Sequence, residues 1–222
     1  PGRLLRLGSF DYCGVPAQAA EALQVCLSDE RGWLATFELQ EDVRADAQAT
    51  VLALRQMGVA VHLLSGDASA SAQRVAARVG IEHVRGDCSP QDKLNFLRHA
   101  QAQGQQVAVV GDGLNDGPVL AGAHVSFAFG QAVPLAQAQA DFMVSGSRLL
   151  DVFESIALSR RTLSVVRQNL AWAAVYNLIC IPLAVAGMLP AWLAGLGMAT
   201  SSLLVVLNAL RLSRDTWQLG KM

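Results

Sequence analysis

Apolar and polar positions follow two different patterns along the chain. In residues 41–147, short apolar runs alternate with segments whose apolar residues recur at helical spacing. The apolar runs are 59–64, 107–110 and 125–129, and the helical repeats include Ala47/Val51/Leu54, Ala72/Val75/Ala76/Val79 and Leu94/Leu97. Short apolar strands that alternate with amphipathic helices are typical of βαβ units. We therefore predict an α/β fold with a parallel sheet for residues 41–147.

The first forty residues do not continue this alternation. Residues 4–9 and 33–37 are strand-like, and we predict a helix from about Pro16 to Leu27 between them. Residues 1–40 are therefore interpreted as the end of a separate small α/β unit.

After residue 147 the pattern becomes continuously helical. Residues 148–168 are amphipathic, whereas Asn169 to Leu210 contain no Asp, Glu, Lys, Arg or His. Residues 169–189 and 190–211 each supply about 20 mostly apolar residues, the length that crosses a bilayer. The pattern predicts two transmembrane helices joined at Pro190, followed by a tail, 212–222. A hairpin buried in a large soluble core is the alternative.

Basic residues flank this apolar region on both sides, while the turn at Pro190 carries no charge. The flanking residues are Arg160, Arg161, Arg167, Arg211 and Arg214. By the positive-inside rule, both flanks and the soluble part lie in the cytoplasm.

Charge and cysteine content exclude several classes. The net charge of −1 gives no indication of a nucleic-acid partner. Four scattered cysteines without a CxxC pair give neither a zinc pattern nor a disulfide framework, which suits a reducing cytoplasm. The sequence starts at Pro1, without an initiator Met and without the layout of a signal peptide, so we expect it to be part of a longer polypeptide.

Candidate chemistry begins with the Gly-Asp-Gly-Leu-Asn-Asp stretch at 111–116, which follows the apolar run 107–110. Asp112 and Asp116 carry hard carboxylate oxygens. Mg²⁺ in proteins is usually bound by one or two carboxylates, and its other coordination positions are filled by water and phosphate oxygens. Gly111 and Gly113 let the backbone turn sharply and approach a ligand closely. This stretch predicts a magnesium site beside a phosphate.

Two further residues support phosphate chemistry. Ser65 ends an earlier predicted strand, where its hydroxyl can donate to a phosphate oxygen, and Lys93 opens a predicted helix. The carboxyl ends of parallel strands meet at one edge of a sheet, so these groups are expected near Asp112 and Asp116. A solvated lysine is the ordinary alternative for Lys93.

These motifs resemble a known family. Ser65-Gly66-Asp67, Lys93 and the stretch 111–118 are similar to the second, third and fourth motifs of the haloacid dehalogenase superfamily, in the form typical of its P-type ATPases. Tyr176-Asn177 and the Met-x-x-Ser-Ser of 198–202 resemble signatures of copper-transporting P-type ATPases. The similarity covers nearly the whole chain, and 169–210 look most like the bacterial pumps that supply copper for cytochrome oxidase assembly.

The resemblance implies specific roles. Asp112 and Asp116 would bind Mg²⁺, and Ser65 and Lys93 would contact the transferring phosphoryl group. Residues near ATP and its phosphates would be Arg44, Gly66, Asp67, Gly111, Gly113 and Asn115, although the motif around Arg44 begins with Glu41 where the family has Asp. A structural role, in which the Asp67 side chain caps the start of a helix, explains this residue almost as well. The implied ligands of Cu⁺, or of Ag⁺, are Tyr176, Asn177, Met198, Ser201 and Ser202.

The membrane residues have an ordinary interpretation as well. A thioether sulfur favours Cu(I), which supports Met198 as a ligand. Gly197 and Ser201, however, form a small-xxx-small face that packs helices without metal. Tyr176 and Asn177 are equally suited to hydrogen bonds between helices.

Family motifs that would precede residue 1 are absent, above all the DKTGT sequence with the phosphorylated aspartate. The resemblance then implies the end of a nucleotide-binding domain (1–40), a phosphorylation domain without its central nucleophile strand (41–147), a linker helix (148–168), and the last two spans. We expect the C-terminal portion of an ATP-driven Cu⁺ pump that is inactive alone. The alternatives are a membrane-anchored phosphatase and a non-catalytic membrane partner.

The expected surroundings follow from the same resemblance. The chain would be part of a multi-pass protein of a bacterial cytoplasmic membrane, with the lipid bilayer, the metal ion, the missing N-terminal part and copper chaperones as partners.

Overall fold

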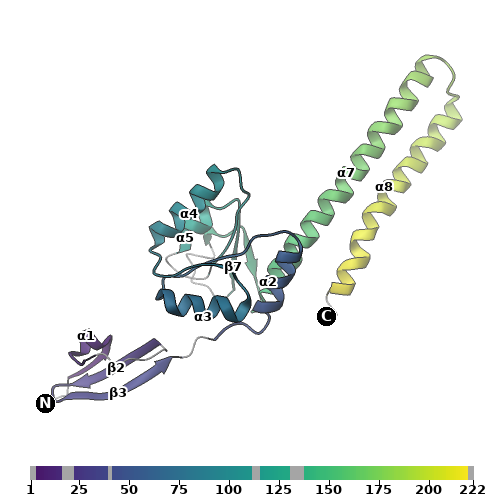
Figure 1. The fold of residues 1–222 in the computed structure, drawn as a ribbon. Helices are drawn as coiled ribbons and strands as arrows, with labels where there is room; N and C mark the ends of the chain where they lie inside the picture. Colours follow the sequence, from purple (N-terminus) through teal and green to yellow (C-terminus); the bar gives the residue numbers. More distant parts are fainter. Residues whose placement is uncertain (1–3, 17–22, 40–41, 112–115, 131–137, 220–222) are drawn as a thin grey trace. The chain divides into compact units, whose positions relative to one another are not determined.

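The computed structural model describes the chain except for residues 1–3, 17–22, 40–41, 112–115, 131–137 and 220–222. The chain divides into two compact units, Pro1–Leu150 and Asp151–Met222. Figure 1 labels their main elements.

The unit up to Leu150 begins with an antiparallel sheet rather than with a helix between two strands. Strands β1 (Leu5–Gly8), β2 (Leu23–Asp29) and β3 (Gly32–Leu39) pair in the order β1–β2–β3, and α1 (Phe10–Cys13) follows β1. The helix predicted from about Pro16 to Leu27 is therefore wrong where the structure describes it, because residues from Leu23 onward form a strand. Cys26 and Ser28 are buried at every second position, as a strand with one covered face requires.

A parallel pair of strands follows. Helix α2 (Ala47–Gln56) leads to β4 (His62–Leu64), α3 (Ser69–Val79), β5 (His83–Arg85) and α4 (Pro90–Ala102). Strands β4 and β5 pair in parallel, and Ala47, Val51 and Val79 form the buried core beneath them. The run 59–64 thus shortens to its last three residues as a strand.

A second group of parallel strands carries the glycine-rich motif. It consists of β6 (Ala108–Gly111), α5 (Gly117–Gly122), β7 (Val125–Phe129) and β8 (Phe142–Val144). Strand β7 lies between β6 and β8, and both pairings are parallel. The prediction of an α/β domain with parallel strands is confirmed.

Among the described parallel strands, β4, β5, β6 and β8 each pair on one edge only. Within the described residues, β4 bonds only to β5 and β6 only to β7, so each has one edge without a partner strand. Val110 in β6 is 43% exposed, whereas Phe127 and Ala128 in β7 are buried. Parallel strands are normally covered on both faces, and an uncovered sheet edge leaves backbone N–H and C=O groups without partners.

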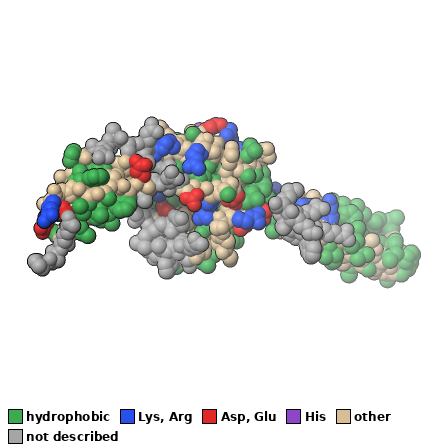
Figure 2. Space-filling view, turned by 90° about the horizontal axis from the view of Figure 1, so that it is seen from below, with side chains coloured by type: hydrophobic (Ala, Val, Ile, Leu, Met, Phe, Trp, Pro, Cys, Tyr) green, Lys and Arg blue, Asp and Glu red, His purple; other side chains and the backbone are tan. Residues whose placement is uncertain are grey.

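Two long helices form the second unit. Helix α7 (Leu150–Val185) runs without a break through the predicted linker 148–168 and most of the predicted span 169–189. After a turn with Gly187 at φ +69°, α8 (Ala191–Leu219) continues past the predicted end at 211. Both helices are long and apolar enough to cross a membrane. Exposed hydrophobic side chains cover the hairpin at the right of Figure 2.

Candidate active site

The turn after β4 places Ser65 and Asp67 in direct contact. The Asp67 backbone N–H donates to Ser65 Oγ at 3.2 Å, and the Ser65 hydroxyl donates to Asp67 Oδ2 at 2.8 Å. The backbone of Ser65 is fixed on both sides, because its N–H donates to the Arg85 carbonyl and its own carbonyl accepts from Cys88, each at 2.9 Å. Asp67 therefore orients the hydroxyl of Ser65, while the loop after β5 holds the turn in place.

The loop after β5 depends on Gly86 and Asp87. A Cβ at Gly86 would lie 2.4 Å from Ser69 Cα, so only glycine fits there. Asp87 has a positive φ of 53°, and its Oδ2 accepts from the backbone N–H of Ser69 at 3.0 Å, at the start of α3. Its own N–H donates to the Asp67 carbonyl at 2.7 Å. The sequence analysis did not single out these two residues, although a Gly-Asp pair after a strand is a turn signal.

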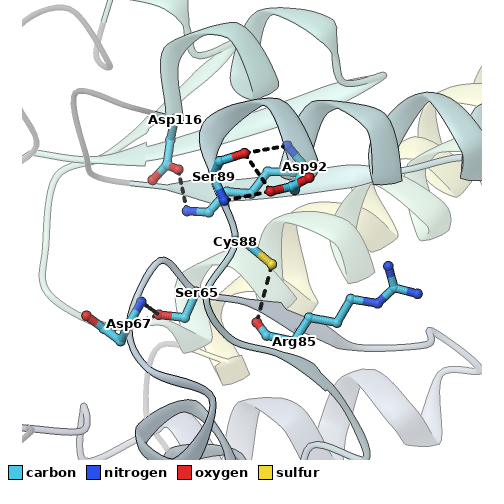
Figure 3. Close-up of polar contacts among 8 residues, drawn as sticks. Ser65, Asp67, Arg85, Cys88, Ser89, Asp92 and Asp116 are labelled. Carbon is cyan, nitrogen blue, oxygen red and sulfur yellow. Dashed lines mark hydrogen bonds and ion pairs between the residues drawn. The ribbon is translucent and has the colours of Figure 1, made fainter.

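Helix α4 starts at a capping box. Asp92 N–H donates to Ser89 Oγ at 3.2 Å, and Ser89 N–H donates to Asp92 Oδ2 at 2.9 Å. The hydrogen bonds from the Ser89 side chain and backbone lower the pKa of the Asp92 carboxyl. Since Cys88 precedes Ser89 directly, the backbone bond from Cys88 N–H to the Ser65 carbonyl also ties the start of α4 to the turn after β4. Figure 3 shows the contacts of Ser65 with Asp67 and of Ser89 with Asp92.

Lys93 in the first turn of α4 forms an ion pair with Asp116. Its Nζ lies 2.8 Å from Asp116 Oδ1, and the two side chains are only 18% and 19% exposed. A cation is disfavoured at a helix N-terminus, so the partner carboxylate accounts for this lysine. The structure thus brings together two residues that are 23 positions apart in the sequence.

Asp116 also lies close to the end of β6. A Cβ at Gly111 would be 3.1 Å from Asp116 Cβ and 3.2 Å from its Oδ2, so glycine leaves room for the carboxylate. Asp112, Gly113 and Asn115 lie outside the described residues. Among the residues that are described, no three His, Cys, Asp or Glu side chains converge on one point. The assignment of Asp112 and Asp116 as magnesium ligands therefore stays a prediction.

The arrangement gathers complementary groups at strand ends. Ser65 with Gly66 and Asp67 follows β4, and Asp116 follows β6 after the motif turn. A hydroxyl, an ammonium group and a carboxylate at such ends suit a phosphate with its metal ion. Figure 3 shows Ser65, Ser89 and Asp116 on three separate segments of the chain.

Arg44 is engaged elsewhere in the same unit. Its Nη1 donates to the Ser147 carbonyl at 2.6 Å, and its guanidinium carbon lies 4.0 Å from the centroid of the Phe129 ring. Two residues later, Asp46 Oδ2 accepts from the N–H of Leu150 at 2.8 Å, where α7 starts. The structure therefore places Arg44 at the junction with α7, and its proximity to a nucleotide stays a prediction.

The hairpin separates the five predicted metal ligands into two sets. Tyr176 and Ser201 lie where α7 and α8 meet: the Tyr176 hydroxyl would be 2.9 Å from a Cβ at Gly197, and Ser201 Oγ accepts from Trp172 Nε1 at 3.0 Å. The other three, Asn177, Met198 and Ser202, are exposed. Trp172 was not predicted, because the contact between two helices is not visible in the pattern of either one.

Comparison with known proteins agrees with this geometry. The parallel strands are consistent with a haloacid dehalogenase-like fold: the family model described as haloacid dehalogenase-like hydrolase matches residues 8–124, more than half of the chain. The chain belongs to this family.

Its relatives within the family are metal pumps. A copper-exporting P-type ATPase of Staphylococcus epidermidis is 42% identical over 174 residues, which cover 78% of this chain and 22% of the relative. A probable copper-importing P-type ATPase A of Enterococcus hirae is 38% identical over 214 residues, or 96% of this chain and 29% of the relative. The predicted resemblance to heavy-metal P-type ATPases is confirmed.

A solved structure supports the same assignment. The crystal structure of a zinc-transporting PIB-type ATPase in its E2.Pi state superposes with a TM-score of 0.74 at 31% identity, covering 85% of this chain and 31% of that one. The chain therefore spans less than a third of the length of the relatives and of the solved structure that it matches.

Proposed function

We propose that this chain is the C-terminal part of an ATP-driven pump that moves Cu⁺ across a bacterial cytoplasmic membrane. The observation that carries the proposal is the Lys93–Asp116 ion pair at the end of a strand that lacks a partner on one edge. Strand β4, which also pairs on one edge only, ends just before Ser65. Ser65 and Asp116, which would handle a phosphoryl transfer together with Lys93 of α4, thus follow two strands that each have an unpaired edge.

The missing neighbour explains why the chain would be inactive alone. A strand from the upstream part of the pump would pair with the free edges of β4 and β6 and satisfy their backbone groups. Its carboxyl end would then lie between Ser65 and Asp116, the position that a phosphorylated aspartate requires. No DKTGT sequence occurs in these 222 residues, so this aspartate has to come from the upstream part.

The residues of the site would share the work of phosphoryl transfer. Mg²⁺, held by Asp116 and Asp112, would neutralise charge on the transferring group. The Lys93 ammonium would contact a phosphoryl oxygen while it still balances Asp116. The Ser65 hydroxyl, oriented by Asp67 in this structure, would turn its proton to another phosphoryl oxygen. ATP-binding roles for Arg44, Gly66, Gly111, Gly113 and Asn115 belong to this proposal.

The hairpin would contribute to the cation path. The thioether of Met198 suits the soft ion Cu⁺, and Ag⁺ shares this chemistry. Tyr176, Asn177, Ser201 and Ser202 would add oxygen ligands or hydrogen bonds around it. The lipid bilayer, the upstream part of the pump and copper chaperones would be its partners. Because the relatives named above are called exporting and importing, the proposal includes no transport direction.

Two experiments test the proposal. ATPase activity of the polypeptide that joins this chain to its upstream part is expected to rise on addition of Cu⁺ and to lose most of that stimulation in Met198→Ala. No response to Cu⁺ or Ag⁺ in the parent protein would refute the transport assignment. The isolated chain, incubated with labelled ATP and Mg²⁺, is expected to incorporate no acid-stable phosphate; incorporation would show that the nucleophile lies within these residues.

A further inference from the structure

Two contacts one helical turn apart hold α8 against α7. Trp172 Nε1 donates to Ser201 Oγ at 3.0 Å, and the hydroxyl of Tyr176 would lie 2.9 Å from a Cβ at Gly197. Trp172 and Tyr176 are four residues apart on α7, and Gly197 and Ser201 are four residues apart on α8, in the antiparallel order. Because residues four apart share a helix face, both contacts belong to one line of contact and define one register.

We propose that Trp172 is a positioning residue for the cation path: its indole N–H fixes Ser201 in the helix contact and thereby sets the rotation of α8. This inference rests on the proposed function, because the residues that the rotation of α8 would orient, Met198 and Ser202, are proposed ligands of Cu⁺.

Helix geometry links the position of Ser201 to these neighbours. Each residue turns an α-helix by about 100°, so Ser202 points well away from the direction of Ser201. Met198 and Ser202 are four residues apart and share a face. With Ser201 held against Trp172, Met198 lies about 60° and Ser202 about 100° around the helix from that contact, which agrees with the 66% exposure of Met198. If the bond to the indole were lost, α8 would rotate more freely about its axis.

A third contact keeps the helices together independently of Trp172. Asn208 Nδ2 donates to Asn169 Oδ1 at 2.9 Å and to Gln168 Oε1 at 3.2 Å, two turns further along α8. Hydrogen bonds between membrane helices are individually weak, so the hairpin does not depend on any single one. Loss of the Trp172 bond is therefore expected to change the metal site and to leave the hairpin assembled.

The test uses the complete pump, reconstituted in lipid vesicles and stimulated with Cu⁺ at saturating ATP. Trp172→Phe keeps an aromatic ring but removes the N–H donor, and Ser201→Ala removes the acceptor. Each variant is expected to raise the Cu⁺ concentration for half-maximal stimulation by about 3- to 10-fold, with KM for ATP unchanged. The double variant is expected to show no further shift, because both changes break the same bond. Trp192→Phe is the matched control, since Trp192 is 70% exposed at the start of α8.

The outcomes separate this inference from the proposed function. A parent pump without metal-stimulated ATPase activity would overturn the proposed function and the inference with it. A stimulated pump whose Trp172→Phe variant behaves like the parent, or whose two single shifts add in the double variant, would overturn the inference alone. If Trp172→Phe does not assemble, Ser201→Ala decides the matter: an unchanged half-maximal Cu⁺ concentration contradicts the proposal.

Discussion

The soluble unit and the helical hairpin fix their candidate residues by different means. In the soluble unit, backbone bonds between loops hold the frame: Cys88 N–H reaches the Ser65 carbonyl, and Asp87 N–H reaches the Asp67 carbonyl. In the hairpin, each helix satisfies its own backbone, and side chains such as Trp172 and Ser201 make the contact between helices. Backbone bonds thus supply part of the frame in the first region, whereas in the second region side chains supply the contact between the helices.

The largest effect is expected from breaking the ion pair of the soluble site. Lys93→Met leaves the Asp116 carboxylate about four-fifths buried without its cation. Removal of one partner of a buried pair is strongly destabilising, here by about 3 kcal/mol. Denaturant unfolding of the chain in detergent micelles measures the loss, and the complete pump is expected to lose ATPase activity by about 100-fold or more.

The double variant Lys93→Met/Asp116→Asn separates stability from chemistry in the same site. It removes both charges, so most of the stability is expected to return while activity stays lost. If stability does not return in the double variant, the ion pair is not what holds Lys93 and Asp116 in place.

A second prediction tests whether backbone contacts are the frame of the soluble site. In Gly86→Ala, the new methyl group would meet Ser69 Cα at 2.4 Å and the Asp67 carbonyl at 2.9 Å, so backbone has to move. We expect a loss of about 2–3 kcal/mol in the free energy of unfolding. Gly66→Ala is the matched control, because its Cβ would meet only the Cys88 carbonyl at an ordinary 3.5 Å. Similar losses for both variants would contradict the close approach at Gly86.

The same contrast explains what the sequence predicts well. Buried β7 has the bounds predicted for it, since a continuous apolar run reflects burial on both faces. The rule on strand ends predicts Ser65 and Asp116 together, and Lys93 is predicted separately from its place at the start of a helix. The prediction of a helix for residues 23–27 is wrong, because strand β2 depends on pairing with β1 and β3, which a local pattern does not contain.

Contacts between elements account for the rest of what was missed. Gly86 and Asp87 act through Ser69 and Asp67 on another loop, and Trp172 acts through Ser201 on another helix. The change from polar to apolar residues near 168 predicts where a membrane would begin, but it does not interrupt α7, because nothing in that stretch breaks a helix.

A third prediction concerns a glycine in the hairpin, which is replaced by alanine as Gly86 was in the soluble unit. Gly197→Ala would bring a methyl group to within 2.9 Å of the Tyr176 hydroxyl, so the Tyr176 side chain has to shift in the contact between the helices. We expect a loss of about 1 kcal/mol, measured by SDS titration of the chain in mixed micelles. At Gly195 the added methyl group would meet nothing within 4 Å, and Gly195→Ala is expected to be neutral or stabilising, because alanine favours helix. Equal behaviour of the two variants would remove Tyr176 from the line of contact.

The smallest effect, a dependence on pH, is expected to separate the two regions. Burial, followed by the positive charges of His83 and Arg85, lowers the pKa of His62, which stacks on His83 at 4.7 Å between ring centroids. The folded state therefore favours neutral His62. Its contribution to stability is complete above the unfolded pKa of about 6.5 and is lost as the pH falls through the lower folded pKa.

Thermal unfolding of the soluble unit at pH 7 and pH 5.5 measures this dependence. His62→Gln is expected to reduce the drop in Tm on acidification by about 1–2 °C, a small change because the side chain is partly exposed. The exposed His99, on α4, supplies the control His99→Gln, for which the drop is expected to match the parent. The transition of the hairpin is expected to stay constant over this range, since Asn169 to Leu210 contain no ionisable Asp, Glu, Lys, Arg or His. A parallel shift of both transitions would mean that the two regions unfold together, and the contrast between them would then not extend to their stability.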